Sequence, residues 1–378
     1  MTSRSHHFLA LVCALAASAG AARASLTTSQ AYSDLWEFDQ TVGNYNLVSI
    51  GNATMNNFGD VEGGLEIGGN LTIGGAAVAT KLTGTDVKNS TTPTLYVAKT
   101  LTDSSSTSIK LNNGYAALPS MSTSAYTWNT STDLLKNKTT GATVLSEVNS
   151  SSPTADVDPR SKNPAVNFTT LQSHMSDVST SLAAATATGT IKVVGSSLEF
   201  VAPVNSSGVV FFDLNMSLLS GNKYNGKTFS NIEIDVPTDL DFVVNVENAN
   251  GKTLFGEGSG INFNSGTGDS RLLWNIEGGT AAHPGTITIG NGGAFYGSVL
   301  AADYNVYDDS NTFINGQVVA DTFSGSTAGN SACDGSGTEM HMLGFNPDLP
   351  PAPEPSTYGL AGAAVLGGLV FLRRKARR

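Results

Sequence analysis

The chain has 378 residues, with 31 acidic and 20 basic side chains, and only 13% of its residues are charged. Seven of the cations lie in two terminal segments that are typical of targeting signals, so the formal net charge falls from −11 for the whole chain to −18 for residues 25–355. A surface this acidic repels nucleic acid and anionic lipid, which excludes nucleic-acid binding. Low charge with abundant small and β-branched residues favours strands and tight turns over helices.

Residues 1–24 form a predicted signal peptide. Arg4 precedes an apolar stretch at 8–17, and small residues follow it and end in Ala22-Arg23-Ala24. A short cationic start, a brief apolar core and an A-x-A site are typical of a secretory signal, which here would be cut between Ala24 and Ser25. We therefore expect export by the Sec machinery.

Residues 25–350 predict one mainly β domain. Residues 29–40 have helical spacing, but from Tyr45 apolar and polar residues alternate, and Gly-Gly pairs begin at 63, 68 and 74. Short strands between glycine corners indicate a β-solenoid-like fold, with a β-sandwich as the alternative. The segment at about 90–165 is rich in turn formers and predicts a loop-rich insert.

Residues 167–186 give the clearest amphipathic helix, which we expect to pack on the β domain. Further on, 295–301 and 314–320 match each other at a separation of 19 residues. A period near 20 with a glycine corner fits one coil of a solenoid, although a hairpin pair in a sandwich would give the same pattern. The helix stripe consists of Phe168, Leu171, Met175, Val178 and Leu182.

Residues 351–378 form a predicted sorting signal. Pro353-Glu354-Pro355 precede an apolar run at 358–372, and five of the last six residues are cations. As a helix the run is about 22 Å long, against a hydrocarbon core of about 30 Å, and the cations would stay cytoplasmic. The three-part pattern resembles the PEP-CTERM sorting signal of Gram-negative bacteria that make exopolysaccharide. A plain tail anchor is the alternative.

The PEP-CTERM resemblance implies that an exosortase recognises and removes the tail. We therefore expect transient anchoring in the inner membrane by a short transmembrane helix, followed by release to the cell surface or the extracellular space.

Five further stretches resemble the choice-of-anchor A family of exported bacterial proteins, and they occur in that family's order. The resemblance implies a surface-associated, mostly β domain with no known catalytic residues. The chain departs from the family pattern at Ala302-Asp303-Tyr304, where a longer acidic loop is expected. The stretches are 45–73, 168–191, 271–276, 295–325 and 339–345.

Metal and catalytic motifs are sparse. The histidines at 174, 283 and 341 share no metal-ligand spacing. Asp303, Asp308 and Asp309 crowd one predicted loop and are weak candidates for Ca²⁺, which takes six to eight oxygen ligands, although a solvated acidic loop is the better interpretation. We expect no cofactor.

These observations favour a non-enzymatic surface or matrix protein that acts in adhesion or associates with exopolysaccharide or other surface components. The alternative is a polysaccharide-active β-helix enzyme, which needs paired carboxylates about 5–10 Å apart. Asp213, Asp235 and Asp241 are the candidates for such a pair. Ice or crystal-surface binding ranks third, because the sequence shows no regular threonine array. The oligomeric state is left open.

Overall fold

We analysed a computed structural model of the chain. It describes residues 28–347 except 57, 83–91, 106–107, 148–157, 165, 235, 238, 256–261, 266–268, 291–293, 310–312 and 326–337. The predicted signal-peptide cleavage at Ala24 and Ser25, the sorting signal at 351–378 and Asp235 lie outside the described residues.

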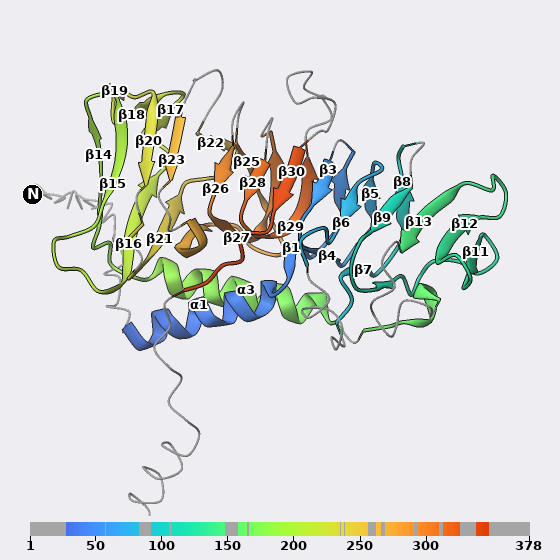
Figure 1. The fold of residues 1–378 in the computed structure, drawn as a ribbon. Coiled ribbons are helices and arrows are strands. Elements are labelled where there is room, and N and C mark those ends of the chain that lie inside the picture. Colours follow the sequence, from blue (N-terminus) through green and yellow to red (C-terminus); the bar gives the residue numbers. More distant parts are fainter. Residues whose placement is uncertain are drawn as a thin grey trace, which may run out of the picture.

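The described chain forms a β-solenoid with two helices along one side (Figure 1). Each regular coil contributes a strand to each of three faces, and successive coils pair in parallel. The prediction of a solenoid-like, mainly β fold is confirmed. We name the faces by their strands: the helix face is β10-β7-β4-β1-β29-β27-β24-β21-β16, the open face is β8-β5-β2-β29-β27-β25-β22, and the third face is β13-β9-β6-β3-β30-β28-β26.

The N-terminal half begins with a helix and then winds outward from the middle of the solenoid. Its coils are short because glycines occupy the corners: a Cβ on Gly69 would lie 2.6 Å from the backbone of Gly51 in the coil before it. The elements are α1 (Thr28–Val42), β1 (Tyr45–Ser49), β2 (Ala53–Met55), β3 (Phe58–Val61), β4 (Gly64–Ile67), β5 (Leu71–Ile73), β6 (Ala77–Val78), β7 (Leu95–Val97), β8 (Leu101–Asp103), β9 (Ile109–Leu111) and β10 (Ala116–Ala117).

A three-stranded meander closes this end of the solenoid. The structure differs here from the predicted loop-rich insert, because residues 95–147 hold seven short strands that continue the coils and then cap them. Strands of two to five residues are too short to show a clear period of two, so the turn formers dominated the sequence pattern. The capping elements are β11 (Tyr126–Asn129), β12 (Leu134–Asn137), β13 (Thr143–Glu147) and a 3₁₀ turn, η1 (Pro159–Ser161).

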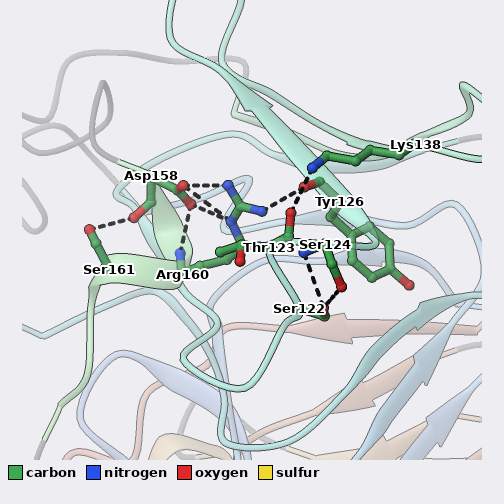
Figure 2. Close-up of polar contacts among 8 residues, drawn as sticks. All are labelled: Ser122, Thr123, Ser124, Tyr126, Lys138, Asp158, Arg160 and Ser161. Atoms are coloured by element: carbon green, nitrogen blue, oxygen red, sulfur yellow. Dashed lines mark hydrogen bonds and ion pairs between the residues drawn. The ribbon is translucent and has the colours of Figure 1, made fainter.

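Arg160 ties the 3₁₀ turn to the capping meander (Figure 2). Its Nε donates to Asp158 Oδ1 at 2.8 Å, and its Nη1 donates to the carbonyl oxygen of Tyr126 at 2.7 Å. The Arg160 side chain is only 10% exposed, so both contacts are largely shielded from water. One guanidinium therefore holds together segments 34 residues apart.

A long helix, α3 (Phe168–Ala183), returns the chain to the opposite end of the solenoid. Asn167 caps it by accepting a hydrogen bond from the Thr170 N–H. The C-terminal half then winds inward from that end. Its elements are β14 (Thr190–Val194), β15 (Ser197–Val201), β16 (Gly208–Asn215), β17 (Leu219–Ser220), β18 (Lys223–Tyr224), β19 (Lys227–Thr228), β20 (Asn231–Ile234), β21 (Leu240–Glu247), β22 (Lys252–Leu254), β23 (Asn262–Ser265), η2 (Asp269–Arg271), β24 (Leu272–Ile276), β25 (Gly285–Ile289), β26 (Phe295–Tyr296), β27 (Ser298–Asp308), β28 (Phe313–Asn315), β29 (Val318–Gly325) and β30 (Thr338–His341).

The two halves meet at a seam in the middle of the solenoid. β1 pairs in parallel with β29, with Leu47 opposite Val318, and β3 pairs in parallel with β30. The predicted 19-residue repeat is the last step before this seam, because Phe295 lies opposite Ile314 and Val299 lies opposite Val318. The repeat therefore marks successive coils, not a hairpin.

Two apolar clusters hold the layers together. One fills the inside of the solenoid, and the other lies between the helix face and the two helices. α3 buries the predicted stripe residues Met175, Val178 and Leu182. Neither helix of the described chain is long and apolar enough to cross a membrane. The outer cluster includes Leu35, Phe38, Val42, Val48, Val243, Leu273, Leu300 and Val319.

Glu66 is a buried carboxyl beneath the first turn of α3. It lies opposite Tyr96 on the helix face, and the Tyr96 ring stacks on Phe168 at 5.8 Å between centroids. The Glu66 residue is 7% exposed. Burial raises the pKa of Glu66 from 4.5 to about 7.

We predict that Glu66 makes the protein less stable as the pH rises. Because its folded-state pKa is raised, folding favours the protonated form; the stabilisation is full below about pH 4.5 and is lost as the pH rises through about 7. The shift from 4.5 to about 7 corresponds to about 3 kcal/mol of unfolding free energy. Denaturant titrations across this range should show that Glu66→Gln removes this part of the pH dependence.

Glu199→Gln is the control. Glu199 lies on β15, in the four-stranded sheet β14-β15-β20-β23, and pairs with Lys192 at the surface. An equal effect of both variants on the pH dependence would contradict the role given to Glu66.

A second prediction concerns the capping meander. Hydrogen bonds from Arg160 lower the pKa of Asp158, so this stabilisation is present above the ordinary carboxyl pKa and is lost as the pH falls through the lowered value. Asp158→Asn should lower the opening free energy of β11–β12 by about 1–3 kcal/mol at neutral pH. Amide hydrogen exchange of that hairpin measures it. Asp239→Asn, an exposed site at the other end, should leave the exchange unchanged.

Candidate functional site

The open face carries a straight row of hydroxyl side chains. Strand register places one hydroxyl residue from each of seven adjacent strands side by side. Neighbours are spaced by the distance between strands, about 4.8 Å, so the row extends for about 29 Å. All its members are at least partly exposed. In spatial order they are Thr102, Thr72, Thr54, Ser324, Tyr307, Thr288 and Thr253.

A second polar row lies beside the first. On six of the seven strands, its residue precedes the residue of the hydroxyl row by two positions. The second row lies at the corner between the open face and the helix face. Asn52 Oδ1 accepts from the Asn70 N–H at 2.8 Å, and Asn70 Oδ1 accepts from the Thr100 N–H at 3.2 Å. Thr322 Oγ1 donates to Asn305 Oδ1 at 2.6 Å. These bonds fix the corner side chains at the spacing of the coils. The row consists of Thr100, Asn70, Asn52, Thr322, Asn305 and Thr286.

The two rows come from a tripeptide that the sequence analysis did not recognise. Asn or Thr, then an apolar residue, then a hydroxyl residue recurs on six of the strands. The middle residue points into the solenoid and is buried, while the outer two reach the surface. An array of hydroxyl residues, five of them threonines, is therefore present, but irregular coil lengths hide its period in the sequence. The triplets start at 52, 70, 100, 286, 305 and 322.

This arrangement can bind an extended ligand by many weak hydrogen bonds. Each hydroxyl both donates and accepts, and a net contribution of about 0.5–1.5 kcal/mol per bond adds up along a row. Neither row contains a charged residue. Asp103 follows Thr102 at one end of the hydroxyl row, and Lys252 precedes Thr253 at the other end. The face therefore suits a neutral, repetitive, hydrogen-bonding surface or chain.

The calcium candidates do not share a loop. Asp303 and Asp308 lie on β27, five residues apart, which is about 16 Å along a strand. Asp308 is fully buried, and the N–H of Asp309 donates to the carbonyl oxygen of Ile289. The predicted acidic loop is replaced by a long strand that bends from the helix face onto the open face. Among the described residues no three acidic, His or Cys side chains form a metal-ligand group, and calcium binding stays a prediction.

The two described carboxylates proposed for an enzyme, Asp213 and Asp241, do not converge either. Asp213 lies opposite Asn245, four residues beyond Asp241, so about 13 Å of strand separates the two positions. Asp241 is fully buried and lies 3.9 Å from Arg271 Nη1. This geometry gives the polysaccharide-active alternative no catalytic pair at Asp213 and Asp241.

The histidines also lie apart, on α3, in a turn after β24 and on β30. His174 contacts Glu37 at 3.3 Å, and His341 contacts Glu339 at 3.0 Å. His174 and His341 therefore each contact a carboxylate at the surface.

Comparison with known proteins gives two family matches. Residues 38–331 match the family described as "Putative Ice-binding-like adhesive domain", and residues 351–375 match the PEP-CTERM protein-sorting motif. No curated protein matches the chain. Among solved structures, the ice-binding protein 1 DUF3494 domain of Shewanella frigidimarina is similar, with 13% identity and a TM-score of 0.30 over 80% of this chain and 93% of that one.

The residues that these two family models match show which of the predicted resemblances hold. The PEP-CTERM signal is confirmed as a motif, whereas membership of the choice-of-anchor A family stays a prediction. The adhesive-domain match extends from α1 to beyond β29 and so includes nearly the whole solenoid. The chain belongs to the ice-binding-like adhesive domain family and ends in a PEP-CTERM sorting motif.

Proposed function

We propose that this protein is a non-enzymatic, exported surface protein that acts in adhesion by binding exopolysaccharide on its open face. The observation that carries the proposal is the double row of hydroxyl and amide side chains at the strand spacing. A polysaccharide presents hydroxyl groups on every residue, so it can satisfy such a row along its whole length. The adhesive-domain match and the sorting motif support a location at the cell surface.

Ice is a second candidate ligand of the same face. A flat, uncharged row with a constant spacing also matches a crystalline surface, and the family description includes ice binding. The ligand in this case is a crystal surface instead of a polysaccharide chain. The same face therefore serves to test both.

Arginine on the open face should weaken binding. Thr54→Arg and Thr288→Arg each place a long charged side chain in the middle of the row, where it lifts a flat ligand off its neighbours. We expect each variant to bind exopolysaccharide from the native host at least about tenfold more weakly, which is about 1.4 kcal/mol. Co-sedimentation of the purified chain with the polysaccharide measures this.

Thr127→Arg, on the exposed side of β11, is the matched control and should bind as the native chain does. All three variants should keep the native thermal stability, because the substituted side chains are not buried. Native binding by the open-face variants would refute the role of this face. Inhibition of ice recrystallisation by the native chain, lost in Thr54→Arg, without polysaccharide binding would replace adhesion with ice binding.

The tail generates a separate prediction. We propose that the mature chain ends at or beside Pro353-Glu354-Pro355 and lacks 358–378. Proline fixes φ and removes backbone donors, so this segment suits an extended, accessible cleavage site. Mass spectrometry of surface-extracted protein from the native host should find the shortened chain.

Inactivation of the exosortase should restore the Arg378 terminus and keep the protein in the membrane fraction. An intact Arg378 terminus in most native molecules would instead make the tail a permanent anchor.

A further inference from the structure

A pocket of about 250 Å³ lies where the flank of α3 meets the corner between the helix face and the open face. The loop after β24 forms its floor with β27. Gly279 allows this close approach, because a Cβ there would lie 2.2 Å from the carbonyl oxygen of Asp303. The lining residues are Ser176, Ser179, Thr180, Ala183, Ile276, Glu277, Gly278, Gly279 and Asp303.

The pocket is acidic. Asp303 Oδ1 is buried and accepts no hydrogen bond from the described chain. Glu277 lines the same pocket, and the Tyr304 hydroxyl donates to its backbone carbonyl oxygen. Burial raises the pKa of nearby Asp321, and the charge of Asp303 raises it further, so the two carboxylates repel each other. A cation in the pocket would relieve this repulsion.

The remaining lining residues indicate which kind of cation fits. The described chain brings together no three acidic, His or Cys groups as metal ligands, so an organic cation fits better than a metal ion. An ammonium group has three donors for carboxylates. Ser176 and Thr180 add hydroxyls that can bond to further polar groups. The volume lies below the roughly 300–1,000 Å³ of pockets for drug-sized ligands, which suits a single ring.

The pocket also adjoins the open face. Asn305, in the corner row, follows Asp303 by two residues on β27, and Thr286 lies opposite Asn305. A chain on the open face can therefore place one of its residues in the pocket.

We propose that this pocket binds one amino-sugar residue with a free ammonium group, as part of a glycan that lies on the open face. The inference rests on the proposed function and narrows it, because it selects glycans with unacetylated amino sugars. Glu277 and Asp303 bind the ammonium group, and the hydroxyls of α3 bind the sugar ring.

Calorimetric titration of the full-length chain tests this with three tetrasaccharides of equal length, made of glucosamine, N-acetylglucosamine or glucose. The glucosamine tetramer should bind at least about tenfold more tightly than the other two, and added salt should reduce the difference. Asp303→Asn and Glu277→Gln should each reduce the preference to about twofold or less. Asp103→Asn, at the far end of the open face, should keep it.

Thermal melting identifies any variant that fails to fold, and Asp303→Asn should melt no lower than the native chain because it removes the repulsion between Asp303 and Asp321. Equal affinity for the three tetramers would overturn the inference, and so would an undiminished preference in both pocket variants. A lysine tetrapeptide that binds more tightly than the glucosamine tetramer would overturn it in favour of a protein partner.

The open-face variants separate this inference from the proposed function. If Thr54→Arg and Thr288→Arg bind host polysaccharide normally while Asp303→Asn loses the glucosamine preference, the pocket stands and the open-face function fails. If the open-face variants lose host polysaccharide while the tetramers bind alike, the proposed function stands and the pocket inference fails.

Discussion

The parallel pairing of β1 with β29 is the contact on which the rest of the molecule depends. It joins residues about 270 positions apart, Leu47 with Val318 and Ser49 with Ala320. Without it, each half of the solenoid would expose the unpaired edge of a coil on all three faces, and open edges invite association with other chains. The closure entropy of so long a loop grows only slowly with its length, so the final stability is compatible with this connection.

The seam also needs polar groups that remain satisfied without water. Gln317 is fully buried, and its amide donates to the carbonyl oxygens of Gly43 and Tyr45, while its Oε1 accepts from the Phe345 N–H. Asn46 donates to the carbonyl oxygen of His341. These two side chains connect the start of the first coil to the end of the last. A buried polar network of this kind specifies one register, because a slip by one residue would leave several groups unpaired.

Local patterns were sufficient to predict the parts of the fold that depend on neighbouring residues. The stripe of Met175, Val178 and Leu182 predicted α3, and the 19-residue repeat predicted the stacking of β26–β27 on β28–β29. The seam could not be predicted, because no local signal relates Leu47 to Val318. The burial of Glu66 was missed for the same reason, since its neighbour Tyr96 stacks on Phe168, about 70 residues further along the chain.

The candidate face was predictable in principle but not from a fixed period. The coils of the N-terminal half have 18, 30 and 21 residues, with Leu47 opposite Leu65, Leu65 opposite Leu95 and Leu95 opposite Ala116. The Asn/Thr-apolar-hydroxyl triplet survives these changes because it depends only on the alternation of side chains along a strand. Insertions at the corners change the loop length at little cost in free energy. The triplet is unaffected, because it follows only from which side chains point into the coil and which point outward.

The position of the chain end relates the fold to the proposed attachment. Phe345 packs edge-on against Phe38 of α1 at 5.3 Å, so the described chain ends on the helix face. Pro353 lies six positions after Pro347, which is at most about 20 Å of extended chain. A tether at the sorting motif would therefore be attached within this distance of the helix-covered side. The open face lies on a different side of the solenoid, so the proposed attachment would leave its hydroxyl rows free for a ligand.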